Sequence, residues 1–269
     1  MDFEFTEDQN AIAEMAGSVF ADYCTDDRLR QFDTSENAFM EPLWQLCTET
    51  GLQALAIPET HGGSGLGMTE LLAVLQAQGR ALGQVPLWRH QLTAATLAAW
   101  ADPALQGWAT EAAAGRALLT LDLSGLSTAR GLQLLATPHG QGWRLEGRVA
   151  ALALAEQSQA ALLLVSVDGQ PRLAFVELDA APITRVPGRM THGEAVADLS
   201  IDGLLIDAHQ LLPAAALDWL EPRSIAALAA LQLGVSTEQI RRTVEYVTER
   251  RQFERSIGSF QAVQMSMAN

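Results

Sequence analysis

The apolar residues of this chain change their spacing twice, and this constrains the fold more than any other feature. In the first third they recur with a helical period, as at Ile12, Ala16 and Val19. From about residue 117 they form short runs separated by Gly, Pro, Asp and Ser, and helical spacing returns near the C-terminus. We therefore predict an α+β multidomain chain with an N-terminal α-helical bundle (1–116), a middle antiparallel β-barrel or sandwich (117–212) and a C-terminal helical domain (213–269).

Local signals place the helices of the first third. Thr6 and Gln9 have the spacing of a capping box, so a helix is expected to begin there. Residues 25–40 are polar and acidic, and they predict a loop or a frayed turn. Further helices are expected over residues 41–50, 68–83, 92–100 and 105–114, with a glycine-rich loop over 55–67.

Composition limits the kinds of ligand that the chain can bind. Its formal net charge is −15, which argues against a general surface for nucleic acid. All 17 basic residues are Arg, so an anion site must use Arg or backbone N–H groups, and Schiff-base chemistry on Lys is excluded. The five His residues lack metal-ligand spacing, so no metal site is expected.

The two Cys residues and the N-terminus indicate a compartment. Cys24 and Cys47 lie in apolar, helical contexts and are expected to be buried free thiols. The acidic start of the chain lacks a signal-peptide core, and no apolar run is long enough to cross a bilayer. We expect a cytoplasmic protein without a membrane partner.

The last 48 residues contain the densest group of candidate binding residues. A long amphipathic helix is expected to begin at Pro222 and to end at Gly258, with Ser259 capping a second helix. Around the junction lie Arg250, Arg251 and Arg255, the rings of Phe253 and Phe260, and the amides of Gln252 and Gln261. This set suits a ligand with a diphosphate and an aromatic ring. The alternative is a helical hairpin with core Phe residues and a solvated Arg face.

The segment YVTERRQFERSIGSFQAVQ (residues 246–264) resembles the flavin-binding signature of the acyl-CoA dehydrogenase family. In that family it reaches across a subunit interface to the FAD of a neighbouring protomer. The resemblance implies that Arg250 binds the pyrophosphate, that Gln252 and Phe253 lie along the adenosine, and that Phe260 and Gln261 close the site. The family's Gly after Phe is Glu254 here, and a carboxylate beside a diphosphate is repulsive unless Arg251 or Arg255 neutralises it.

The resemblance extends over the whole chain, with departures. The loop LAIPETHGGSGLG (residues 55–67) is similar to a family segment that follows the second helix. In the barrel, family residues that contact the isoalloxazine ring are replaced: Ala151 stands for a Trp and Ala153 for a Thr, and LTLDLSGLSTARG (residues 119–131) keeps only polar remnants. The family continues with further helices, so the C-terminal domain is expected to be incomplete relative to it.

No catalytic residue is assigned. The family abstracts a proton with a Glu that lies, in most members, in later helices. In a minority it lies early in the long helix, where the alignment places Ser224. Glu221 is one turn earlier, and a solvated carboxylate favoured by the helix dipole is the simpler interpretation.

The resemblance implies an enzyme that desaturates an acyl-CoA thioester at the α,β bond with FAD and passes electrons to an electron-transfer flavoprotein. The segment that reaches a neighbour's FAD (residues 246–264) is retained, whereas the barrel residues that contact the isoalloxazine ring are replaced. This combination predicts one subunit of a heteromer, whose homologous partner shares the FAD, as in enzymes of steroid or terpenoid side-chain catabolism. Three alternatives stay open: a self-sufficient homomeric dehydrogenase, a non-catalytic structural subunit, and a flavin-dependent monooxygenase on the same fold.

Overall fold

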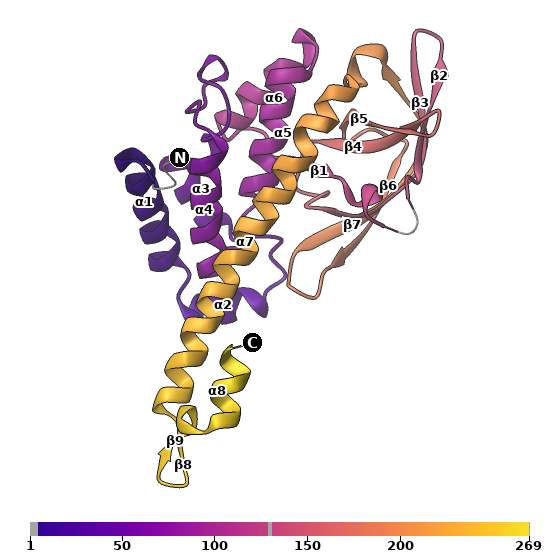
Figure 1. Cartoon of the computed structure of the whole chain (residues 1–269). Helices are drawn as coiled ribbons and strands as arrows, with labels where there is room; N and C mark the ends of the chain where they lie inside the picture. The colour runs from indigo at the N-terminus through magenta and orange to yellow at the C-terminus, as the bar shows by residue number, and fades with distance from the viewer. Residues whose placement is uncertain (1–4, 129–130, 269) are drawn as a thin grey trace.

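The computed structural model describes residues 5–128 and 131–268. Helices fill one side of the molecule, a curled sheet fills the other, and α7 runs along both (Figure 1). This helical, β and helical order confirms the fold class expected from the sequence. No helix in the described part of the chain is long and apolar enough to cross a membrane. The exact division into three domains stays a prediction.

The N-terminal layer is helical. Its helices are α1 (Glu7–Tyr23), α2 (Asp26–Asp33), α3 (Glu41–Glu49), α4 (Met68–Ala81), α5 (Leu87–Trp100) and α6 (Pro103–Ala113). The capping box at α1 is confirmed: Thr6 Oγ1 accepts from the Gln9 N–H at 3.2 Å, and the Gln9 side chain accepts from the Thr6 N–H at 3.0 Å. The thiols of Cys24 and Cys47 are buried and free.

The expectation of a loop over residues 25–40 is wrong for its first part, which forms α2. Thr25 caps this helix by accepting a hydrogen bond from the Arg28 N–H, and Asp26 and Asp27 lie in the first turn, where the helix dipole favours carboxylates. None of its residues is fully buried. Leu29 and Phe32 are half-buried and pack against the helical core, so the polar composition hid a helix that combines capped ends with a small apolar face.

The glycine-rich loop over residues 55–67 is a loop, as predicted, and close packing explains one of its glycines. A Cβ at Gly63 would lie 2.1 Å from the carbonyl oxygen of Ile57. Only glycine fits at this approach. Buried amides hold the neighbouring backbone: Gln91 accepts from the Ala56 N–H and donates to the Leu52 carbonyl.

The sheet is curled and mixed. It comprises β1 (Leu119–Asp122), β2 (Leu134–His139), β3 (Gly142–Ala153), β4 (Ala160–Val167), β5 (Gln170–Glu177), β6 (Ile183–Arg189) and β7 (Ala195–Asp207). Its order is β1-β4-β2-β3-β7-β6, with β5 paired to β4. The predicted hairpin turn joins β2 to β3. The expectation of a purely antiparallel sheet is corrected in one respect, because β4 pairs in parallel with β1 and β2.

Strand alternation divides the apolar residues between two cores. On β4, Leu162 and Leu164 pack with the helices, whereas Leu163 and Val165 lie in the core enclosed by the sheet. Phe175 on β5 belongs to the helical core and tilts against Trp108 of α6, with ring centroids 5.4 Å apart. One side of the sheet is therefore fixed to the helical layer.

Helix α7 (Ala214–Glu249) is longer than expected and contains Pro222. The prediction that this helix begins at Pro222 is wrong: it begins two turns earlier, and the ring replaces one internal N–H donor. Buried Ala216, Leu217 and Leu220 compensate by packing the first turns against the core. At 1.5 Å per residue, a helix of this length spans about 54 Å.

Close backbone contact joins α7 to α4. A Cβ on Gly79 of α4 would lie 2.1 Å from the Leu231 carbonyl oxygen, and a Cβ on Gly234 of α7 would lie 2.1 Å from the Gln76 carbonyl oxygen. Both glycines are therefore required for the distance between the two helices. This contact fixes the direction in which the far end of α7 projects beyond the helical layer (Figure 1).

Candidate functional site

The predicted binding residues lie at the far end of α7, in a segment that we call the arm (residues 250–268). The hairpin of β8 (Arg251–Gln252) and β9 (Arg255–Ser256) forms its tip, and α8 (Gln261–Ala268) folds back beside α7 (Figure 1). Arg250 caps α7: its N–H donates to the Tyr246 carbonyl at 2.9 Å, and its carbonyl accepts from the Ile257 N–H at 2.8 Å. Both ends of the hairpin are thereby fixed to the helix.

Two expectations about this junction are wrong. The helix ends at Glu249 rather than at Gly258, because the chain enters the hairpin there. Ser259 does not cap α8: its hydroxyl donates to the Ser256 carbonyl at 2.7 Å, within a short 3-10 turn over Ile257–Ser259. The arm is therefore a hairpin followed by a short 3-10 turn and α8, so α7 and α8 do not follow each other directly.

The turn of the hairpin requires an unusual backbone. Phe253 and Glu254 both have positive φ, 52° and 65°. Positive φ at both central residues of a two-residue hairpin loop is the requirement of a type I′ turn, which favours Asn-Gly or Gly-Gly. A side chain in this region costs about 1–2 kcal/mol per residue. From the sequence we expected only a conflict of charge at Glu254, and not this demand on the backbone.

Aromatic and guanidinium groups meet on the arm. The Phe253 and Phe260 rings contact edge to face, with centroids 6.2 Å apart at 80°. The Arg255 guanidinium carbon lies 4.0 Å from the centre of the Phe260 ring, a cation–π contact. The structure thus brings together the two predicted Phe residues. Phe253 is 87% exposed, so its ring is available to a ligand or a partner.

Arg250 differs from the arginines further up α7. Within the described residues its side chain makes no hydrogen bond or ion pair, and it is exposed. By contrast, Arg241 and Arg242 are both bound to Glu238, whose pKa is lowered to about 2 chiefly by its hydrogen bond from Arg241. The Arg250 guanidinium is therefore an exposed cation on the arm that no described residue pairs with.

The predicted amides are also on the surface. Gln252 lies in the hairpin, paired with Arg255, and Gln261 is the first residue of α8. Both are exposed, and no hydrogen bond of either side chain is found in the described part of the chain. No hydrogen bond joins these two amides within the described residues.

A cavity lies in the β region, among residues of β1, β2, β3 and the segment that joins β1 to β2. It has a volume of about 320 Å³ and is lined by Asp122, Ser124, Arg148 and several apolar residues. Burial raises the pKa of Asp122, and its carboxylate accepts from the Ser124 N–H at 3.1 Å. None of the described residues that line the cavity is aromatic.

Ala151 and Ala153, which stand where the family has a Trp and a Thr, form hydrogen bonds through their backbone groups. Ala151 has a positive φ of 53°, and its N–H donates to the Asp198 carboxylate at 2.8 Å. The Ala153 carbonyl accepts from the buried Thr120 hydroxyl at 2.8 Å. Neither methyl group can stack on a ring or donate a hydrogen bond, so the two alanines cannot take over the functions of a Trp and a Thr side chain.

The position aligned with the family's catalytic base is enclosed. Ser224 is 4% exposed, and its hydroxyl has no hydrogen-bond partner in the described part of the chain. Glu221 is half-buried and makes no ion pair with the described residues. A hydroxyl is a poor base without an activating group, and none of the described residues forms a hydrogen bond with the Ser224 hydroxyl.

Comparison with known proteins gives the class of this fold. Residues 6–116 match the family model "Acyl-CoA dehydrogenase, N-terminal domain". The chain is 33% identical to the acyl-CoA dehydrogenase FadE27 of Mycobacterium tuberculosis over 273 aligned positions, which cover 100% of this chain and 72% of the relative. It is 29% identical to the acyl-CoA dehydrogenase IpdE2 of the same organism, covering 98% of this chain and 71% of that protein. The chain belongs to the acyl-CoA dehydrogenase family.

Two solved structures superpose closely on this chain. The ChsE4-ChsE5 complex from Mycobacterium tuberculosis contains a chain that superposes with a TM-score of 0.92 at 31% identity, covering 100% of this chain and 74% of that one. A Tcur3481-Tcur3483 steroid acyl-CoA dehydrogenase variant superposes at 0.88 and 31% identity, covering 97% and 72%. This chain therefore resembles a subunit of a two-component acyl-CoA dehydrogenase.

Proposed function

We propose that the chain is one subunit of a heteromeric acyl-CoA dehydrogenase, in which its arm supports FAD held by a homologous subunit. The complex would desaturate an acyl-CoA thioester at the α,β bond and pass electrons to an electron-transfer flavoprotein. The likeness to a ChsE4-ChsE5 complex and to a steroid acyl-CoA dehydrogenase supports a partner subunit and a bulky steroid or terpenoid acyl group.

One observation carries the proposal: the exposed Arg250 guanidinium has no partner among the described residues, and the same arm presents the exposed Phe253 ring. A guanidinium can donate two parallel hydrogen bonds to a diphosphate. The exposed Phe253 ring can pack on an adenine, and Gln252, Phe260 and Gln261 can close the same site. These residues fit the adenosine diphosphate part of FAD.

The barrel fits the remaining part of FAD poorly. When bound, FAD supplies the acceptor for the hydride that leaves Cβ of the acyl group. In this chain Ala151 and Ala153 provide neither a stacking ring nor a hydroxyl donor for the isoalloxazine, and Ser224 provides no carboxylate base. The proposal therefore assigns the isoalloxazine contacts and the proton abstraction to the partner, and cofactor support to this chain.

The test compares visible absorption spectra of the purified chain alone and of its complex with a homologous acyl-CoA dehydrogenase subunit from the same organism. We expect a flavin spectrum only in the complex. Arg250→Gln should lower the flavin content of the complex, whereas Arg30→Gln, an equal loss of charge on exposed α2, should leave it unchanged.

Other outcomes would select the alternatives. Stoichiometric flavin on the isolated chain would contradict sharing and favour a self-sufficient homomer. Full flavin content in the Arg250→Gln complex would favour a structural subunit that only stabilises its partner.

A further inference from the structure

The hairpin tip carries a carboxylate that nothing on the described chain neutralises. Arg255, the adjacent residue, lies over the Phe260 ring. Arg251, three positions earlier, donates from Nη2 to the backbone carbonyl of Glu254 at 3.3 Å. No ion pair of the Glu254 side chain occurs among the described residues. The charge of Glu254 is therefore left to solvent or to a partner.

Phe253 and Glu254 share one turn, so an interface that covers one must reach the other. The Phe253 ring is 87% exposed and is held in place against Phe260, which makes it a preformed anchor for a docking surface. Burying this ring on a partner brings the adjoining carboxylate to the edge of the interface or inside it. A carboxylate that loses water there is costly unless a cation or several donors meet it.

The same charge acts against a second copy of this chain as the partner. The chain carries 32 acidic and 17 basic residues, for a net charge of −15. Two copies repel each other at long range, and a further carboxylate at the docking tip adds to that repulsion. A different subunit with a basic docking surface is favoured instead.

We propose that Glu254 selects the partner: the hairpin tip docks on a homologous subunit that presents an Arg or Lys side chain to the Glu254 carboxylate. This inference rests on the proposed function, since it takes the arm to dock on a flavin-holding subunit. Glu254 is then a specificity determinant of assembly, and the positive φ that it tolerates accompanies this role.

The test measures the Kd between the chain and the homologous subunit by analytical ultracentrifugation, at low and at physiological salt. Glu254→Gln keeps the size and the backbone conformation but removes the charge, and it should weaken binding at least about tenfold, with a smaller dependence on salt. Glu254→Asp should retain most of the affinity. Glu249→Gln, the same loss of charge at the end of α7 and outside the turn, should leave the Kd unchanged.

Several outcomes would overturn the inference. Glu254→Gln binding as tightly as the natural chain would show that the partner presents no cation there. An equal loss in Glu249→Gln would mean that only the net charge of the chain matters. Flavin content of the complex separates this inference from the proposed function: if Arg250→Gln removes flavin but Glu254→Gln leaves the Kd unchanged, sharing stands and partner selection falls. A chain that binds no homologous subunit would overturn both.

Discussion

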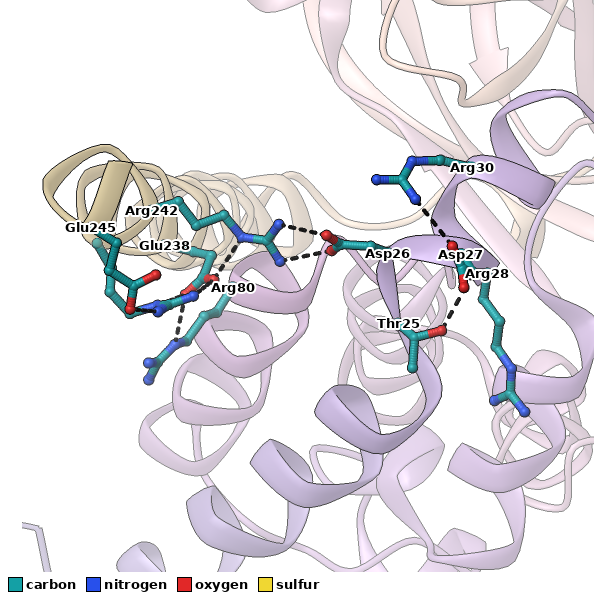
Figure 2. Close-up of polar contacts among 10 residues, drawn as sticks. Thr25, Asp26, Asp27, Arg28, Arg30, Arg80, Glu238, Arg242 and Glu245 are labelled. Carbon is teal, nitrogen blue, oxygen red and sulfur yellow. Dashed lines mark hydrogen bonds and ion pairs between the residues drawn. The ribbon is translucent and has the colours of Figure 1, made fainter. Parts of the chain in front are cut away.

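Arg242 on α7 donates two hydrogen bonds to Asp26, the first residue of α2, at 3.0 and 3.2 Å (Figure 2). The same guanidinium donates a hydrogen bond to the Glu238 carboxylate at 2.9 Å. This carboxylate also accepts hydrogen bonds from Arg80 of α4 and from Arg241. Because α2 buries none of its residues fully, this ion pair is its main polar link to α7. The network thus joins three helices that are distant in sequence.

We expect Asp26→Asn to release α2 from α7. Hydrogen exchange of the amides of residues 26–33 should become faster, while α4 and α7 keep their protection. Asp27→Asn is the matched control, because it removes a carboxylate from the same first turn, but one that pairs only with Arg30 inside α2. Equal acceleration in both variants would attribute the effect to the helix dipole instead.

The same link should respond to acid. The hydrogen bond from Arg242 lowers the pKa of Asp26 below its ordinary value of 3.8. A lowered folded pKa means that the contribution is present above pH 3.8 and is lost as the pH falls through the folded value. Protection of α2 should therefore be retained at pH 5 and decline below pH 3.8. Loss of protection already at pH 5 would contradict this assignment.

Strong local patterns gave correct predictions in this chain. Predictions failed for elements whose stability depends on contacts with distant residues. The capping box of Thr6 and the apolar run of β4 were readable because each is a local signal in the sequence. Helix α2 was missed because part of its stabilisation comes from an ion pair between Asp26 and a residue 216 positions away, and because its apolar face is limited to the half-buried Leu29 and Phe32. The Thr25 cap and the acidic first turn of Asp26 and Asp27 were local signals that could have revealed it. Pro222 led to a wrong start for α7, because the buried residues that precede it stabilise the helix on both sides of the proline.

His90 provides a second pH-dependent prediction. It is fully buried: its Nδ1 accepts from the Leu119 N–H at 3.3 Å and its Nε2 donates to the Ala112 carbonyl at 3.2 Å, which fixes the neutral form. Burial lowers the pKa of His90 from 6.5 to about 4. Between these values the unfolded chain binds the proton and the folded chain does not, so stability falls as the pH falls.

His90 alone should lower the free energy of unfolding by about 2 kcal/mol between pH 7.5 and pH 5. Urea unfolding over this range should show the loss. His90→Gln should be less stable at pH 7.5, since it loses the fitted imidazole, but its stability should depend less on pH by about the same amount. An unchanged pH dependence in this variant would assign the proton uptake to other groups.

The candidate site was predictable as a set of residues but not as a shape. The spacing of Arg250, Phe253 and Phe260 pointed to one surface, and the ring contact between the two Phe residues agrees with that placement. The hairpin between them was not predicted, because two consecutive side chains at positive φ contradict local preference. Which groups of a partner meet Arg250 depends on a second chain, about which this sequence carries no information.

The buried thiols should be unreactive in the folded protein. Burial raises the pKa of Cys24 to about 11 and that of Cys47 to about 12, so the reactive thiolate is scarce at pH 8. We expect a disulfide reagent such as DTNB to modify neither thiol at pH 8 until denaturant unfolds the helical layer, and then to titrate both. Fast reaction of one thiol in the native protein would show that its part of the layer opens locally.

The contact between α4 and α7 gives a direct test of how the arm is positioned. Gly79→Ala or Gly234→Ala would place a methyl group 2.1 Å from a backbone carbonyl oxygen of the other helix, so the two helices must separate. We expect each variant to lose at least about 2 kcal/mol of stability. At roughly 2–4 °C per kcal/mol, Tm should fall by about 4 °C or more.

Gly107→Ala is the control, because Gly107 is a helical glycine of α6 whose added Cβ would meet nothing within 4 Å. Alanine should stabilise this helix by up to about 1 kcal/mol, since it restricts the unfolded backbone more than glycine does. Opposite changes of Tm at Gly79 and Gly107 would show that the close approach of α4 and α7, rather than helix propensity, decides the cost. A Tm that rises in all three variants would contradict this packing, and with it the direction in which α7 carries the arm toward a partner.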